Sequence, residues 1–309
     1  MPQPHHLVAL VGPTASGKTA VAIEAARRLN CGVEIVSADS RQVRQEMVIG
    51  TAAPTQTELA AVPHHAIASV APDAPYAVVD WLMEARAALD AIWSRGGLPL
   101  LVGGTGQYVW ALLDGWSMPA VEPDVALRAE FEAYANEHGA DALHTRLGAL
   151  DPASATRIDA RNIRRVVRAL EVVTVTGAPV PALEPRDPGF TWGGVGLQWE
   201  RAPLHARTDA RVVAMFEAGL VAEARGLAER YGRGFPALSS IGYREALGVL
   251  DGTLTEAGAV RQTQIATHRL IRMQAAWFRL DDPRIEWVPG GDIEAAVGAV
   301  VRAARPPVP

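Results

Sequence analysis

The chain has 309 residues, 49% of them apolar and 20% charged, a composition typical of a soluble globular protein that can bury a sizeable core. Its net charge of −5 at pH 7 neither indicates nor excludes nucleic-acid binding, since phosphate contacts are made by a local part of a surface. The single cysteine, Cys31, excludes an internal disulfide and any multi-cysteine metal site. Because no signal peptide and no apolar run of membrane-spanning length is found, we expect a cytoplasmic protein without membrane contact.

The first patterned stretch combines two apolar runs with a glycine-rich segment. An apolar run at 7–11 is followed by Gly-Pro-Thr-Ala-Ser-Gly-Lys-Thr at 12–19, a helical pattern and a second apolar run at 33–36. Between strand and helix, the spacing G-x4-G-K-[ST] is typical of a loop whose backbone N–H groups surround a phosphate. A glycine turn without a ligand is the weaker alternative. The residues expected to hold the phosphate-bearing ligand are Gly12, Pro13, Thr14, Ala15, Ser16, Gly17, Lys18 and Thr19.

Lysine usage supports this interpretation. Only one of the 29 Lys and Arg residues is a lysine, and it is Lys18, at the motif position. An ammonium is a compact point charge, whereas a guanidinium would be bulkier at the bottom of the loop. The hydroxyl of Thr19 is the expected protein ligand for Mg²⁺.

Strands and helices continue to alternate after this loop. The stretch 41–75 is rich in loop signals, and a later apolar strand covers 99–102. Such alternation predicts a parallel sheet, with ligands bound at the carboxyl ends of its strands. We therefore expect the 12–19 loop to lie near Asp39-Ser40 and Gly104-Thr105.

From Ser117 the pattern changes to helices without strands, bordered by prolines. Helical patterns cover 124–138, 140–149 and 162–175. We therefore expect an all-helical lobe at 119–192, inserted into a P-loop catalytic core made of 1–118 and 193–309. Arginines spaced three and four residues apart share a face of the lobe: Arg161, Arg164, Arg165 and Arg168. A solvated face, or ion pairs with neighbouring acids, is the alternative.

The rest of the chain is predicted to be helical, apart from strands at 193–199 and 285–288. Helical patterns cover 204–231, 242–250, 255–279 and 292–304. The predicted fold class is α/β, a P-loop-type parallel sheet flanked by helices, with an inserted all-helical lobe.

The position of the acidic residue leaves the chemistry open at this point. Enzymes that hydrolyse nucleotides or transfer phosphoryl groups usually carry an acid after a later strand, but the strand at 99–102 is followed by Gly-Gly-Thr-Gly. The available carboxylate is Asp39, after the second strand. It can act near a magnesium ion, as a general base, or as a cap together with Ser40.

Several motifs, taken in order, resemble those of tRNA dimethylallyltransferases. They are GPTASGKT at 12–19, the spacing Ser37-x-Asp39-Ser40-x-Gln42, MVIGTAAPT at 47–55, VPHH at 62–65, LLVGGTGQY at 100–108, RALEV at 168–172, IGYREAL at 241–247 and WFR at 277–279. The resemblance spans residues 7–290. It implies transfer of a dimethylallyl group from dimethylallyl diphosphate to N6 of the adenosine next to the anticodon of tRNA, with release of diphosphate.

The resemblance also implies roles for individual residues. Lys18, Thr19 with Mg²⁺, and Arg211 would stabilise the diphosphate held by residues 12–19, and Asp39 would be the general base. The residues implied to contact the tRNA anticodon stem-loop are Asp39, Ser40, Arg41, Gln42, Thr105, Arg128, Arg164, Arg165, Val166, Val167, Arg168, Ser239, Ser240, Ile241, Gly242, Tyr243 and Arg244. We expect the protein to act as a monomer.

Three other functions stay open on the residues alone. The first is a small-molecule kinase that uses ATP at the same loop. The second is a non-catalytic phosphate-sensing or tRNA-binding module. The third is an isoprenyltransferase that acts on free adenine nucleotides, although a helical lobe favours a macromolecular acceptor.

Overall fold

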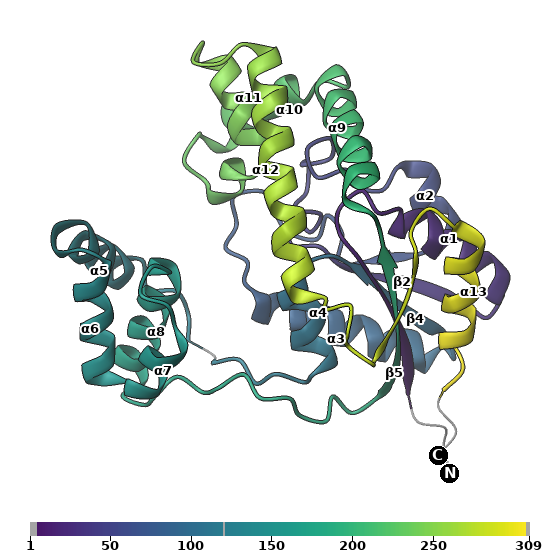
Figure 1. Cartoon of the computed structure of the whole chain (residues 1–309), viewed down its shortest axis with the longest axis horizontal. Coiled ribbons are helices and arrows are strands. Elements are labelled where there is room, and N and C mark those ends of the chain that lie inside the picture. Colours follow the sequence, from purple (N-terminus) through teal and green to yellow (C-terminus); the bar gives the residue numbers. More distant parts are fainter. Residues whose placement is uncertain (1–4, 120, 307–309) are drawn as a thin grey trace. The chain divides into compact units, whose positions relative to one another are not determined.

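In the computed structural model, which describes residues 5–119 and 121–306, the apolar runs of the sequence form one sheet of six parallel strands (Figure 1). The strand order is β3-β2-β4-β1-β5-β6. The strands are β1 (His6–Val11), β2 (Val33–Ala38), β3 (His64–His65), β4 (Leu98–Gly103), β5 (Thr191–Gln198) and β6 (Ile285–Pro289). All residues of β1 are buried, as expected for a central strand that is covered on both faces. The predicted α/β fold class is confirmed.

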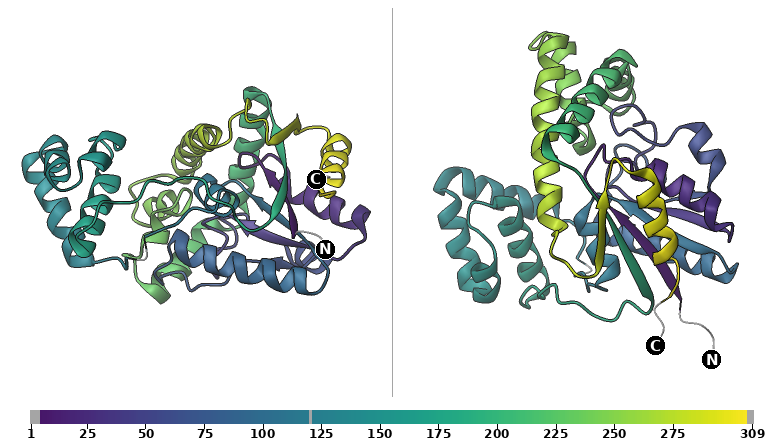
Figure 2. Two further views of the ribbon diagram at one scale, coloured as in Figure 1. Left: turned by 90° about the horizontal axis from the view of Figure 1, so that it is seen from below. Right: turned by 45° about the vertical axis from the view of Figure 1, so that its right-hand side comes forward.

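Helices cover both faces of this sheet. Helices α1 (Lys18–Leu29) and α13 (Ile293–Ala303) lie side by side on one face, where they pack on Val8 and Leu10 of β1 (Figure 2). Helices α3 (Val78–Ser94) and α4 (Gly106–Leu113) pack beside β2 and β4, and the indole N–H of Trp81 donates to the Ser37 carbonyl over 2.9 Å. These layers fix the carboxyl ends of the strands.

Four further helices follow the carboxyl end of β5. They are α9 (Arg201–Glu217), α10 (Leu220–Tyr231), α11 (Tyr243–Leu250) and α12 (Glu256–Trp277), with a short 3-10 helix, η1, at Pro236–Ser239 (Figure 1). They share a second apolar core, which includes Phe216, Leu220, Leu227 and Tyr243. This core is separate from the one beneath α1 and α13.

Two differences from the sequence-based expectations concern the residues around the sheet. The helical stretch expected at 204–231 is two helices, because Gly219 adopts φ +99°, a left-handed conformation that interrupts a right-handed helix and favours glycine. The stretch 41–75, expected to be loops, contains α2 (Gln56–Ala61) and β3. Helix α2 is short, and its start carries a Thr55–Glu58 capping box.

The chain divides into two compact units. The core unit comprises Met1–Leu113 and Asp187–Pro309, and the helical unit comprises Asp114–Arg186. Residues 1–4, 120 and 307–309 belong to the ranges expected for the core and the lobe, and they lie outside the described residues. Among the described residues, no helix combines the length and the apolarity that crossing a bilayer requires.

The helical unit has its own apolar core. Its helices are α5 (Val125–His138), α6 (Ala140–Leu150), α7 (Pro152–Arg157) and α8 (Ile163–Thr176). Phe131, Leu143, Leu147, Val166 and Leu170 are buried between them. One face of α8 is strongly apolar, and its burial in this core holds the four helices together.

A buried carboxylate, Glu171, organises the charged groups of this unit. Glu171 is fully buried and accepts hydrogen bonds from the Arg128 guanidinium at 2.8 and 2.9 Å, from the Asp124 amide at 2.7 Å and from Arg168. Burial by itself would raise the pKa of Glu171, but the hydrogen bonds from Arg128 and Arg168 outweigh it and lower the pKa below its usual value. The two arginines therefore neutralise a charge inside the helical unit.

We predict that Glu171→Gln lowers the free energy of unfolding of the helical unit by about 2 kcal/mol at pH 7, because two guanidiniums lose their charged acceptor. Since folding lowers the pKa of Glu171 below 4.5, this contribution is present above about pH 4.5 and is lost as the pH falls further. Urea denaturation at several pH values measures both effects. Glu132→Gln, at an exposed position of α5, is the control. A loss no larger than that of the control would contradict the prediction.

Candidate active site

The glycine-rich loop between β1 and α1 packs closely at the carboxyl end of the sheet. Gly17, directly before α1, has φ +96°. Gly12 has φ +154°, and an added Cβ would lie only 3.2 Å from the Leu197 carbonyl oxygen, so a side chain there would be strained and tightly packed. Helix α1 begins at Lys18, so the positive end of its dipole points at the loop. Glycine at these two positions allows the backbone N–H groups to approach an anion closely.

Lys18 lies at the bottom of the loop. Its ammonium donates to the carbonyls of Gly12 at 2.9 Å and of Pro13 at 2.8 Å. Burial lowers the pKa of Lys18 to about 8, the nearby Asp39 carboxylate raises it, and the positive charge of Arg211 lowers it further. A cation that burial disfavours in this way gains stability when an anion binds beside it.

The carboxyl ends of β2 and β4 are tied together, as the sequence predicts. The Thr105 amide donates to the Ala38 carbonyl over 3.1 Å, and the Thr105 hydroxyl accepts from the Ser40 amide over 3.0 Å. Asp39 lies between them at the end of β2. These bonds bring Asp39, Ser40 and Thr105 into one site.

Asp39 caps the turn that follows it. Its Oδ1 accepts from the amides of Arg41 at 2.8 Å and of Gln42 at 3.3 Å. The capping role considered from the sequence is therefore real, but it uses one carboxylate oxygen. Within the described part of the chain, Oδ2 has no hydrogen bond, so this oxygen stays available for chemistry.

Arg211 enters the site from α9. Desolvation lowers the pKa of Arg211, and the Asp39 carboxylate raises it. Across residues 5–119 and 121–306, no acid forms an ion pair with its guanidinium. The site thus places two cationic groups, Lys18 and Arg211, against one carboxylate. Its excess positive charge favours an anion.

Gln274 of α12 joins two of the site loops and was not predicted from the sequence. Its Oε1 accepts from the Thr14 amide over 2.9 Å, and its Nε2 donates to the Gly104 carbonyl over 3.1 Å. Trp199 adds a third tie, because its indole N–H donates to the Ser16 carbonyl over 3.0 Å. Side chains from distant segments therefore hold the phosphate loop in place.

Glu223 of α10 is a second residue that the sequence analysis missed. Its carboxylate accepts from the backbone amides of Val48, Ile49 and Gly50 at 2.9 to 3.2 Å, and from the Tyr243 hydroxyl. This clamp fixes the turn whose Ala52 carbonyl accepts from the Gln42 amide group over 3.0 Å. Glu223 thereby supports Gln42 without lying in the site itself.

The segment 239–244 contributes fewer accessible groups than expected. Ser240, Gly242 and Tyr243 are buried, and burial together with the charge of Glu223 raises the pKa of Tyr243. Ser239 and Arg244 are exposed, and Arg244 pairs with Glu245. Only part of this segment can meet a macromolecule directly.

The residues expected at 164–168 also divide into two groups. Val166 and Val167 are buried in the core of the helical unit, and Arg168 pairs with Glu171. Arg164 and Arg165 are exposed, and the structure gives neither of them an ion pair with a described residue. The ion-pair alternative therefore applies to Arg168 and also to Arg161, which pairs with Asp159.

Two models of known protein families match the chain. A family model described as IPP transferase matches residues 42–281, and one described as isopentenyl transferase matches residues 5–66. The chain belongs to the IPP transferase family.

Individual members cover nearly the whole chain. A tRNA dimethylallyltransferase of Chloroflexus aurantiacus is 47% identical over 286 residues, which are 92% of this chain and 96% of the relative. The crystal structure of the full-length tRNA isopentenylpyrophosphate transferase of Bacillus halodurans has 36% sequence identity and a TM-score of 0.70, with 97% of each chain covered. As an IPP transferase the chain is a prenyl-transferring enzyme, and a small-molecule kinase is not favoured.

For this IPP transferase we predict that Glu223→Gln speeds amide hydrogen exchange at Val48, Ile49 and Gly50 about tenfold, because a neutral amide is a weaker acceptor than a carboxylate by about 1.4 kcal/mol. Mass spectrometry of exchanged peptides measures the effect. Glu229→Gln, at an exposed position of the same helix, is the matched control. Unchanged exchange at the turn would show that the clamp contributes nothing.

Proposed function

We propose that this enzyme transfers a dimethylallyl group from dimethylallyl diphosphate to N6 of the adenosine next to the anticodon of tRNA, releasing diphosphate. One observation carries the proposal: at the phosphate loop the charges of two cations, Lys18 and Arg211, interact with that of a single carboxylate, Asp39. This is the charge pattern that the departure of a diphosphate anion from a carbon atom requires. Its relatives carry the name tRNA dimethylallyltransferase.

The loop and its cations would act on the leaving group. As the bond between C1 and the diphosphate oxygen breaks, negative charge develops on that oxygen. The backbone N–H groups of the loop that no internal hydrogen bond uses, together with the Lys18 ammonium and the Arg211 guanidinium, would stabilise this charge. The electron pair of the broken bond leaves with the diphosphate.

Asp39 would act on the nucleophile. The adenine N6 amine is weakly nucleophilic and loses a proton as its bond to C1 forms, and the free Oδ2 of Asp39 can accept that proton. To reach this position the base must leave its stack in the RNA. Ser40, Gln42 and Thr105, which internal hydrogen bonds hold in place, would contact the extruded base.

The residues present fit a magnesium ion held mainly by the substrate. Among the described residues there is no group of three or more His, Cys, Asp or Glu side chains that could hold a metal. Mg²⁺ bound to a diphosphate needs few protein ligands and keeps several waters. Thr19, in the first turn of α1, would supply its hydroxyl, and the ion would neutralise charge on the diphosphate.

We propose that the helical unit binds the anticodon arm of the tRNA. Arg164 and Arg165, exposed and without an acidic partner among the described residues, are the groups available for its phosphates. Arg128 and Arg168 would support them indirectly, since both neutralise Glu171. Action as a monomer in the cytoplasm stays a prediction.

The test is to incubate the protein with labelled dimethylallyl diphosphate and an anticodon stem-loop, and then to analyse the RNA nucleosides by mass. We expect dimethylallyl-adenosine in the stem-loop and free diphosphate. Labelled ATP tests the kinase alternative, and AMP tests a free-nucleotide acceptor. Phosphate transfer without prenyl transfer, or prenylation of AMP alone, would contradict the proposal.

We predict that Asp39→Asn lowers turnover about 100-fold or more while RNA affinity changes little, because an amide keeps the cap but is a much weaker base. Single-turnover rates and RNA binding measure the two effects separately. Asp90→Asn, at an exposed position of α3, is the control. An unchanged rate would remove Asp39 as the general base.

We predict that inorganic diphosphate binds more weakly as the pH rises through about 8, because the free protein then loses the proton of Lys18. Calorimetric titration between neutral and alkaline pH measures this dependence. Lys18→Arg stays charged throughout, so it should bind more weakly at neutral pH and lose the lysine-specific part of the pH dependence. Identical pH profiles for both proteins would contradict the assignment.

A further inference from the structure

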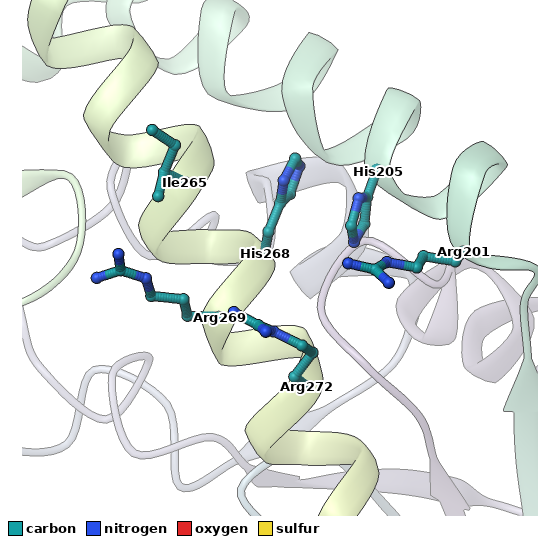
Figure 3. Close-up of a pocket in the computed structure, with 6 residues that line it drawn as sticks. All are labelled: Arg201, His205, Ile265, His268, Arg269 and Arg272. Atoms are coloured by element: carbon teal, nitrogen blue, oxygen red, sulfur yellow. The ribbon is translucent and has the colours of Figure 1, made fainter.

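A cationic pocket lies between α9 and α12, and no residue of the phosphate loop lines it (Figure 3). Its cavity volume is about 330 Å³. The residues that line it are Arg201, His205, Ile265, His268, Arg269 and Arg272. None of them has a role in the reaction described above.

Three guanidiniums in this pocket lack a counter-charge. Arg201, Arg269 and Arg272 are exposed, and the structure gives none of them an ion pair or a hydrogen bond with another described residue. Among the described residues no acid lines the pocket; Asp209 of α9, outside the lining, lies 2.8 Å from Nε2 of His268. The pocket therefore carries an excess of positive charge.

Two stacked imidazoles form one wall of the pocket. The rings of His205 and His268 are 3.8 Å apart and nearly parallel, with an interplanar angle of 8°. Nε2 of His205 is buried and has no hydrogen-bond partner in the described part of the chain. Figure 3 shows this ring on the side of α9 that faces α12, near Arg201. A buried polar atom without a partner indicates a site completed by a ligand.

We propose that this pocket binds a backbone phosphate of the RNA substrate, and the proposal rests on the proposed function. Guanidiniums match phosphate oxygens with paired hydrogen bonds, and the first turns of α9, which carry Arg201 and His205, add the positive end of a helix dipole. Ile265, 46% exposed, offers an apolar surface to a sugar.

Position along α12 favours RNA over a free anion. Arg269 precedes Gln274, which contacts the phosphate loop, by five residues, about 7–8 Å along the helix axis. An RNA strand that delivers a base to the reaction centre thus passes within reach of the pocket. A phosphate bound here would orient the strand and take no part in bond breaking.

The test uses the double variant Arg201→Gln/Arg269→Gln in the full chain. We expect about tenfold weaker binding of an anticodon stem-loop at moderate salt, and a salt dependence of log K that is shallower by about 1 to 2. Turnover at saturating RNA and the affinity for inorganic diphosphate should not change. The matched control is Arg225→Gln/Arg261→Gln, which removes two exposed arginines from α10 and α12 outside the pocket.

Each outcome supports or overturns the proposal. Equal weakening by the two double variants would show general electrostatic attraction, and it would overturn the proposal. Unchanged RNA binding together with weaker binding of diphosphate would assign the pocket to a free anion, and it would overturn it too. If the wild type binds the stem-loop without prenylating it, the proposed function fails, while the binding comparison still decides the role of the pocket.

Discussion

The burial of the Lys18 ammonium is the constraint on which the rest of this structure depends. Two carbonyls of the glycine-rich loop hold the ammonium, burial lowers its pKa to about 8, and Arg211 adds a second positive charge nearby. Asp39 offsets part of this charge. The site is therefore stable enough to fold, yet it gains further when an anion binds, which is the property required to stabilise a leaving diphosphate.

Long-range hydrogen bonds place the loops around this charge. Gln274 joins the phosphate loop to Gly104, and the Glu223 clamp holds the turn at 48–50 that supports Gln42. Both residues belong to the helices that follow β5. The sheet brings the strand ends together, and these helices fix the loops in the relative positions that the chemistry needs.

Arginines serve different purposes in different parts of the chain. In the helical unit, Arg128 and Arg168 neutralise the buried Glu171, whereas Arg164 and Arg165 face solvent without an acid. In the pocket between α9 and α12, three guanidiniums likewise lack counter-charges. Arginines that form no internal ion pair can still attract RNA phosphates, because no acid of the protein neutralises their charge.

The sequence alone determined the alternation of strands and helices, the all-helical insertion and the loop at 12–19, because local apolar periodicity and turn residues encode them. It also placed Asp39 and Thr105 at neighbouring strand ends, since parallel topology follows from that alternation. Only the tertiary structure decided the roles of Gln274 and Glu223, which bond to segments at least 170 residues away. It likewise decided that Tyr243 is buried and that Arg168 is paired. Such facts depend on which surfaces meet, and no local pattern carries that information.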